Sequence, residues 1–439
     1  TVNERGQALG TALLERAYAY DAAGQLVARA DSLRGRQDFR YDPTGRILAS
    51  LPAQGSPLAR ELFAFDPAGN LLDSIPGKDG QPVDTTLGVV GDNRLRFYQD
   101  LHFEYDVHGN VTKRTRGNQK AGTQEVLDLT WNADHQLIES NTTRHGVTQA
   151  TRYAYDPLGR RVAKSDAFGS THYLWDGDLM VHSQRGARQA LYIYEPGSFV
   201  PLATIQGAGE EHSTYWYQCD QIGAPLELTD EQGQVAWAAD YKVWGEAVMR
   251  SVLRTGTDDQ PVSARAWGIK VTVPTPRRSV EQPLRLQGQQ FDEETGLNYN
   301  LFRYYDPKIG RFISQDPIGV LGGSNLFEFA TNPLTLKDPW GLKSIPHTDT
   351  NGGKGYEIYA ICKDGGVVGY VGQTGDLSTR QGQHQESGRL PKNDTLKPIT
   401  NVPSYGDARG FEQKMIEHHD TLNGKWGCPC GKGNIGNKK

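Results

Sequence analysis

The sequence has few cysteines and no long apolar run, and each absence excludes a class of protein. Only four of the 439 residues are cysteine, namely Cys219, Cys362, Cys428 and Cys430. A framework of disulfides therefore does not hold this fold together. No apolar stretch approaches the roughly 20 residues of a membrane-spanning helix, and we expect no membrane-spanning segment. The chain starts with Thr and no signal peptide follows, so we expect it to be a piece of a longer protein.

The composition is typical of a folded protein of several domains. Hydrophobic residues make up 36% of the chain and charged residues 23%, and the net charge is −5. The charge is uneven, because residues 343–439 hold 13 Lys and Arg against 10 Asp and Glu. That net charge of +3 leaves −8 for residues 1–342. A mildly basic end on an acidic body is compatible with contact to a polyanion such as nucleic acid.

A short motif recurs along the first part of the chain. It has an aromatic residue, Asp or Asn, two variable residues and then usually Gly, and its copies begin at Tyr20, Tyr41, Phe65, Tyr105, Trp131 and Tyr155. In the Trp131 copy, His135 stands at the Gly position. Asp caps the start of a turn and Gly accepts a positive φ, so each copy predicts a hairpin. One hairpin cannot bury its apolar face alone, so the pattern predicts a long stacked β-sheet.

The repeats and the segment after them resemble the YD-repeat, or Rhs, proteins. The resemblance covers about residues 15–342, and its most specific stretches are 286–297, 303–312, 314–319 and 338–342. It implies a mainly β protein whose sheet is wound into a shell, with repeats in residues 1–282 and a core-associated segment in residues 283–342. The polar stretch 250–281 is longer than the corresponding linker of the family, and we interpret it as a surface insertion.

The same resemblance implies that the shell cuts its own chain after Leu342. Asp316 and Asp338 match the two carboxylates of the family, and Arg311 precedes the first of them. Two neighbouring carboxyls share a proton, so one could activate water while the other protonates the carbonyl or the leaving amine. An arginine could orient one of them. Both aspartates precede proline, so their spacing alone would also fit turn residues.

Residues 343–439 predict a separate small α+β domain. After a polar linker, two apolar strands at 356–362 and 367–372 flank an Asp-Gly turn, which favours a hairpin. A helix is expected to begin near Asp376 and to carry Arg380 and His384 on one face, because they are four residues apart. A second helix is predicted from about residue 407 to 422.

This small domain resembles the GIY-YIG nucleases, although Glu357 replaces the first glycine of the motif. In the chemistry that the resemblance implies, Glu412 holds a Mg²⁺ or Mn²⁺ ion and Arg380 grips the phosphate. Tyr359 is then the candidate general base. The implied catalytic residues are Tyr359, Tyr370, Arg380, His384, Glu412 and Asn437, with Asn434 as the alternative to the last. Zinc binding by His418, His419, Cys428 and Cys430 is a further hypothesis, but a Cys-x-Cys pair lacks the usual spacing and also fits a Gly-rich loop.

Together the two resemblances imply a polymorphic toxin. The shell would enclose a nuclease and release it by autoproteolysis at the Leu342–Lys343 bond, and the nuclease would cleave DNA in the cytoplasm of a competing cell. Implied partners are DNA, a cognate immunity protein, the N-terminal remainder of the shell and a secretion machine such as type VI. The alternative is a structural or cell-surface adhesion array whose C-terminal domain only binds nucleic acid or another partner.

Overall fold

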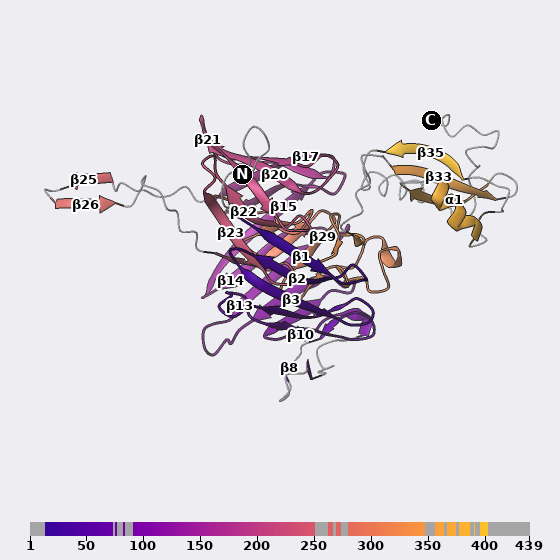
Figure 1. Cartoon of the computed structure of the whole chain (residues 1–439). Coiled ribbons are helices and arrows are strands. Elements are labelled where there is room, and N and C mark those ends of the chain that lie inside the picture. The colour runs from indigo at the N-terminus through magenta and orange to yellow at the C-terminus, as the bar shows by residue number, and fades with distance from the viewer. Residues whose placement is uncertain are drawn as a thin grey trace, which may run out of the picture. The chain divides into compact units, whose positions relative to one another are not determined.

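The computed structural model consists of two compact units (Figure 1). The larger comprises Thr1–Leu174, Val181–Glu195 and Phe199–His347, and the smaller comprises Trp175–Met180, Pro196–Ser198 and Thr348–Lys439. The structure describes residues 14–72, 75–76, 82–83, 91–250, 262–266, 269–273, 280–346, 356–363, 367–374, 377–386, 390 and 396–402.

The repeats form two long antiparallel sheets in which each strand pairs with the next along the chain. The first sheet has five strands, β1 (Arg16–Tyr20), β2 (Leu26–Asp31), β3 (Gly35–Tyr41), β4 (Ile47–Pro52) and β5 (Glu61–Leu62). The second has fifteen, β10 (Phe97–Tyr98), β11 (Leu101–Tyr105), β12 (Val111–Arg116), β13 (Glu125–Trp131), β14 (Leu137–Arg144), β15 (Val147–Tyr155), β16 (Arg161–Asp166), β17 (Gly169–Asp176), β18 (Leu179–Arg185), β19 (Arg188–Tyr194), β20 (Pro201–Ala208), β21 (Glu211–Cys219), β22 (Pro225–Thr229), β23 (Val235–Tyr241) and β24 (Ala247–Met249). The stacked hairpins predicted from the repeats are thereby confirmed.

Shorter elements accompany these sheets. Three small hairpins are β6 (Ala64–Phe65) with β7 (Leu71–Leu72), β8 (Ile75–Pro76) with β9 (Pro82–Val83), and β25 (Val262–Ala266) with β26 (Ile269–Val273). The last of them lies in the stretch that we interpreted as an insertion. Two 3₁₀ turns are η2 (Gly91–Asn93) and η3 (Gly319–Leu321).

The repeated Asp and Gly residues act in the turns as their sequence positions predict. In the turn between β11 and β12, Asp106 Oδ1 accepts hydrogen bonds from the backbone N–H groups of His108 (2.9 Å) and Asn110 (2.8 Å). Gly109 has a φ of +84°, which favours glycine. In the Trp131 copy, His135 adopts a φ of +58° at the corresponding position.

The segment after the repeats forms a four-stranded sheet and packs on the buried face of the repeat sheets. Its strands are β27 (Gln290–Asp292), β28 (Leu297–Asn300), β29 (Arg303–Asp306) and β30 (Arg311–Phe312), and β31 (Leu336–Lys337) with β32 (Ile345–Pro346) follows. A buried cluster joins both parts and contains Ile222, Ala224, Leu286, Tyr305, Phe312, Phe329 and Ala330. Residues 280–346 therefore belong to the core of the larger unit.

Buried ion pairs fix this segment in place. The Arg161 guanidinium and the Asp292 carboxylate form an ion pair in which each side chain is 1% exposed. Lys164 Nζ lies 3.0 Å from Asp292 Oδ1 and 3.0 Å from Glu294 Oε2. Burial alone would raise the pKa of Asp292, but Arg161 and Lys164 hold that pKa below its usual value.

The smaller unit contains a three-stranded antiparallel sheet and one helix among the residues described. The sheet order is β34–β33–β35, with β33 (Tyr356–Lys363), β34 (Val367–Thr374) and β35 (Lys397–Val402), and helix α1 spans Leu377–Glu386. The predicted hairpin and first helix are confirmed, whereas the predicted helix at 407–422 lies outside the described residues. Within the described part of the chain, no helix has the length and apolar character needed to cross a membrane.

Candidate functional site

Two aspartates and one arginine converge in the interior of the larger unit. Arg303 begins β29, Asp316 lies in the loop after β30, and Asp338 directly follows β31. Arg303 Nη2 is 3.1 Å from Asp316 Oδ2 and 3.5 Å from Asp338 Oδ2. The three residues are 2%, 8% and 1% exposed, respectively. One guanidinium thus lies between two buried carboxyls, as the pairing of Asp316 with Asp338 in the sequence analysis requires.

Each aspartate holds a turn with one oxygen and faces the arginine with the other. Asp316 Oδ1 accepts a hydrogen bond of 2.9 Å from the backbone N–H of Ile318. Asp338 Oδ1 accepts hydrogen bonds from the N–H groups of Leu342 (3.0 Å) and Lys343 (3.2 Å). The two interpretations of these Asp-Pro sequences, as turn residues and as paired carboxyls, are therefore compatible.

The Leu342–Lys343 peptide bond lies directly beside these carboxyls. Asp338 Oδ1 contacts its nitrogen through the Lys343 N–H. A Cβ added to Gly322 would overlap Asp316 Oδ2 and would lie 2.6 Å from the Leu342 carbonyl oxygen, so Asp316 is on the carbonyl side of the bond. Leu342 is 3% exposed. Lys343, on the other side of the bond, is exposed. One carboxyl thus lies near each half of a bond that joins a buried residue to an exposed one.

Burial and charge in this cluster favour retention of one proton. Burial raises the pKa of Asp338, with Arg303 opposing the effect, and burial lowers the pKa of Arg303. Asp338 Oδ2 accepts no hydrogen bond from the described residues and has only the ion pair with Arg303. A single buried guanidinium thus faces two carboxyl groups.

The arginine in this cluster is not the one that the sequence analysis selected. Arg311 Nη1 donates to Asn70 Oδ1 (3.3 Å), its Nη2 donates to the Asn93 carbonyl, and its guanidinium lies 4.8 Å from the Phe327 ring centroid. Arg303 takes the place beside the carboxyls, and it also donates through Nε to the Gly341 carbonyl. The available signal was an arginine directly before two aromatic residues of a buried strand.

The structure brings some of the predicted nuclease residues into one unit. The register pairs Tyr359 with Gly372 and Ile361 with Tyr370, two pairs apart along the β33–β34 hairpin. On α1, Arg380 is half-buried and His384 is 2% exposed.

The remaining predicted residues of this unit, Glu412, Asn434, Asn437, His418, His419, Cys428 and Cys430, lie outside the described residues. Among the residues that are described, no group of three or more His, Cys, Asp or Glu side chains could hold a metal ion. The predicted metal site and zinc site therefore stay predictions.

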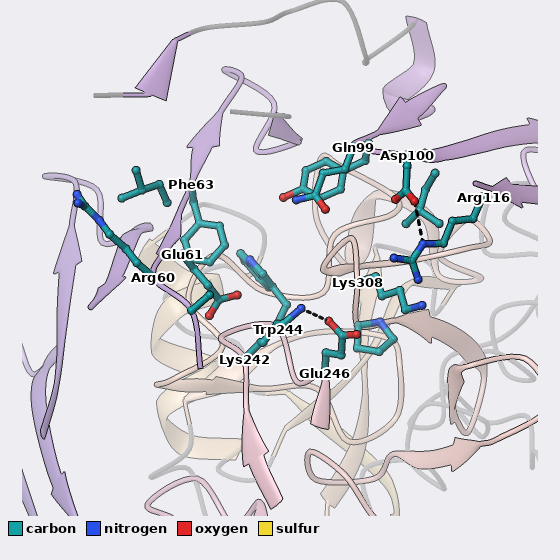
Figure 2. Close-up of a pocket in the computed structure, with 15 residues that line it drawn as sticks. Arg60, Glu61, Phe63, Gln99, Asp100, Arg116, Lys242, Trp244, Glu246 and Lys308 are labelled. Carbon is teal, nitrogen blue, oxygen red and sulfur yellow. Dashed lines mark hydrogen bonds and ion pairs between the residues drawn. The ribbon is translucent and has the colours of Figure 1, made fainter. Parts of the chain in front are cut away.

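A second polar feature is a cavity of about 580 Å³ between β5, β10 and the turn before β24 (Figure 2). Two ion pairs lie on its wall, Lys242 Nζ with Glu246 Oε2 at 2.7 Å and Arg116 Nε with Asp100 Oδ2 at 2.9 Å. Burial raises the pKa of Glu61 to about 7. Most of these charges satisfy one another, which distinguishes this cavity from the carboxyl pair at Arg303.

Three stretches of the stacked hairpins match known families. Residues 20–57 and 131–171 match the family described as RHS Repeat, and residues 214–250 match the family described as RHS protein. Together with the relatives below, these matches support the conclusion that the chain is an Rhs/YD-repeat protein.

Three curated relatives show the extent of the similarity. The chain is 39% identical to "Double-stranded DNA deaminase toxin A" of Burkholderia cenocepacia, in a match covering 76% of the chain and 23% of the relative. It is 28% identical to "Toxin protein Tse5" of Pseudomonas aeruginosa (75% and 27%) and 30% identical to "Probable deoxyribonuclease RhsB" of Dickeya dadantii (74% and 21%). The chain therefore spans about a quarter of the length of these relatives. Among solved structures, "Crystal Structure of TcdB2-TccC3-Cdc42" matches with a TM-score of 0.44 and 17% identity over 78% of this chain and 19% of that chain.

Proposed function

We propose that this chain is part of a polymorphic toxin whose repeat segment cuts the Leu342–Lys343 bond and so separates residues 343–439. The observation that carries the proposal is the pair of buried carboxyls on the two sides of this bond with Arg303 between them. The names of the relatives, which describe two toxins and a probable deoxyribonuclease, support the wider assignment.

The reaction would be a hydrolysis of the aspartic-protease kind. One carboxylate takes a proton from a water molecule whose oxygen attacks the Leu342 carbonyl carbon. The carbon–nitrogen bond then breaks, and the other carboxyl gives its proton to the Lys343 nitrogen. Asp338 is the candidate proton donor, because burial raises its pKa and because the hydrogen bond that its Oδ1 accepts from the Lys343 N–H keeps the carboxyl beside the leaving nitrogen. Its proton would be carried on Oδ2, which accepts no hydrogen bond from the described residues. Arg303 orients both carboxyls, and its positive charge partly offsets the negative charge of the pair.

Replacement of either carboxyl tests this proposal. Asp316→Asn and Asp338→Asn should leave the 439-residue chain uncut, whereas the parent should yield fragments that end at Leu342 and begin at Lys343. Denaturing gels and mass spectrometry of the fragments report both results. Asp156→Asn is a matched control, because Asp156 also precedes proline and caps a turn through Oδ1 (2.9 Å to the Leu158 N–H) but lies in a repeat. Cleavage of both site variants at the parental rate would exclude the mechanism.

For residues 343–439 we propose metal-dependent cleavage of DNA. The support is the β33–β34 hairpin, the position of Arg380 and His384 on α1, and the sequence resemblance to GIY-YIG nucleases. In this proposal Tyr359, Tyr370 and His384 position water and move its proton, and Asn437 completes the site. Glu412 would hold a Mg²⁺ or Mn²⁺ ion, and the bound ion would neutralise charge that develops at phosphorus.

Supercoiled plasmid incubated with the cleaved protein tests the nuclease. Nicking should require Mg²⁺ or Mn²⁺, stop with EDTA and disappear in Glu412→Ala, while Glu417→Ala in the same predicted helix should retain it. Intact plasmid under all conditions would instead favour the alternative, a repeat array whose C-terminal part only binds its partner.

The biological setting is part of the same proposal. The toxin would be a secreted effector that a secretion machine, type VI or related, delivers into the cytoplasm of a target cell. The N-terminal remainder of the shell would complete its enclosure, and a cognate immunity protein would protect the producer. Expression of residues 343–439 in a bacterial host should stop growth, and co-expression of the immunity protein should restore growth.

A further inference from the structure

Asn70 is a buried asparagine in an early repeat that contacts the core segment more than 200 residues later in the chain. It follows Gly69 in the turn between β6 and β7 and is 2% exposed. Its Nδ2 donates to Asp66 Oδ2 and to Asn93 Oδ1, both at 2.8 Å. Its Oδ1 accepts from Asn325 Nδ2 at 2.9 Å and from Arg311 Nη1 at 3.3 Å. The amide therefore uses both ends to join the repeat turn to the core segment.

The contact with Asn325 leads directly to the candidate cleavage site. The carbonyl of the next residue, Leu326, accepts hydrogen bonds from the Asp316 backbone N–H (2.9 Å) and from Arg303 Nη1 (3.1 Å). Asn325 Nδ2 also donates to the Ala68 carbonyl at 3.1 Å. The Leu326 carbonyl thus contacts both Asp316 and Arg303 of the candidate site. The repeat turn contacts Asn325, the residue that precedes Leu326.

We infer that Asn70 is a positioning residue for self-cleavage, acting through Asn325 and the Leu326 carbonyl on Asp316 and Arg303. This inference rests on the proposed self-cleavage at Leu342. It means that the site is completed only after the early repeat has docked on the core segment, so cleavage reports that these two parts of the chain have come together. A displacement of about 1 Å in a reacting group is enough to slow a reaction strongly.

A second asparagine provides a matched control. Asn110 occupies the same place in the turn between β11 and β12, is also 2% exposed, and donates from Nδ2 to Asp106 Oδ2 at 2.8 Å. Its other side-chain contact is His135 Nδ1 at 3.0 Å, within the repeats. Replacement of Asn110 therefore removes the same side-chain turn chemistry without removing a contact to Asn325. The turn's own contact with the core segment, from the Val111 N–H to the Ile313 carbonyl at 2.9 Å, is made by backbone and is kept.

The test is the rate of cleavage in the 439-residue chain after a pulse of cell-free synthesis, followed on denaturing gels. Asn70→Ala should slow cleavage roughly tenfold, and Asn110→Ala should change it less than about twofold. Asn325→Ala should reproduce the effect of Asn70→Ala, and the double variant should be no slower than either, because the two residues act through one contact. The pH profile of the rate should shift in the Asn70 and Asn325 variants, because the Leu326 carbonyl that accepts from Arg303 is then less firmly positioned, and should not shift in Asn110→Ala.

Stability is measured separately in chains that carry Asp316→Asn and so stay uncut. Equal losses of stability for Asn70→Ala and Asn110→Ala, together with unequal cleavage rates, support positioning. Equal cleavage rates for these two variants, or an unshifted pH profile in Asn70→Ala, would overturn the inference. Failure of the proposed function has a different signature, namely an uncut parent or a cut Asp316→Asn chain.

Discussion

At the scale of single residues, the site depends on how Asp316 and Asp338 divide their oxygens. Each Oδ1 caps a turn and each Oδ2 faces Arg303, so the backbone of the turn fixes the direction of the oxygen that would react in the proposed cleavage. A carboxyl that is held by its own turn loses little freedom when it reacts. Asp338 also caps the turn that contains the Leu342–Lys343 peptide bond, and this bond therefore lies close to its carboxyl.

Gly322 leaves the room that this arrangement needs. A Cβ at this position would overlap Asp316 Oδ2 and lie 2.6 Å from the Leu342 carbonyl oxygen. We predict that Gly322→Ala lowers the cleavage rate at least about 100-fold, because it separates the carboxyl from the bond. Gly382→Ala is the control, because nothing lies within 4 Å of a Cβ at that helical position. Gel analysis of fresh protein measures both, and normal cleavage in Gly322→Ala would contradict the assigned geometry.

Glu61 supplies a prediction about pH. Its Oε2 accepts a hydrogen bond from the Val243 N–H, and burial raises its pKa from 4.5 to about 7. Between these two values the folded chain binds a proton that the unfolded chain has released, so this residue makes the folded state less stable as pH rises. Glu61→Gln should remove this dependence and raise the free energy of unfolding by up to about 3 kcal/mol at pH 8, with no gain near pH 4.5. Denaturant titrations across this pH range, in uncut chains carrying Asp316→Asn, measure it; an equal effect at both pH values would refute the assignment.

At the scale of elements, the core segment packs closely against the turns of the repeats. A Cβ on Gly109 would lie 2.7 Å from Gln315, the residue before Asp316, and a Cβ on Gly245 would lie 3.0 Å from Leu286. A Cβ on Gly159 would lie 3.3 Å from the ring of Phe302, the residue before Arg303. Glycine therefore suits these turns through its positive φ, and it leaves room for the close approach of the segment that carries the candidate site.

The turn between β29 and β30 gives the clearest test of close approach. Gly310 has a φ of +65° and a Cβ there would lie 2.6 Å from the Trp244 ring, whereas Gly24 has a φ of +78° with nothing within 4 Å. Gly310→Ala should lower the free energy of unfolding by about 3 kcal/mol or more, and Gly24→Ala by about 1–2 kcal/mol from backbone strain alone. Urea titration of uncut chains compares the losses of stability in the two variants. Equal losses would mean that the close approach of Gly310 to the Trp244 ring does not affect stability.

Sequence reasoning succeeded where the information is local. The Asp and Gly of each repeat predicted the turns, and the Asp-Gly turn predicted the β33–β34 hairpin, because these depend on a few neighbouring residues. It also paired Asp316 with Asp338. It selected Arg311 in place of Arg303, because the choice between two arginines on adjacent strands depends on which side of the sheet faces the loop. The contact of Asn70 with Asn325 joins positions far apart in the chain, and nothing local indicates it.

At the scale of the larger unit, a buried ion network joins the first repeats to the last. Arg16 and Arg34 both contact the Glu227 carboxylate, and Arg34 Nε lies 2.6 Å from Asp240 Oδ1. Asp31 receives Arg16 Nε at 2.7 Å. These contacts connect β1 and β2 with β22 and β23, which lie side by side in Figure 1. The repeat region thus closes on itself through charges that are almost fully withdrawn from water.

Glu227 is the position of this ion network at which a substitution should lower the free energy of unfolding most. Its side chain is fully buried, so Glu227→Gln would leave Arg16 and Arg34 without their shared counter-charge in the interior. The expected loss is about 3–5 kcal/mol in the free energy of unfolding. Asp38→Asn is the matched control, since Asp38 pairs with Arg36 at 2.7 Å on the surface and should contribute no more than about 1 kcal/mol. Guanidinium or urea unfolding of uncut chains would measure both. If the loss for Glu227→Gln were as small as that for Asp38→Asn, the network would not be what holds the two ends of the repeat region together.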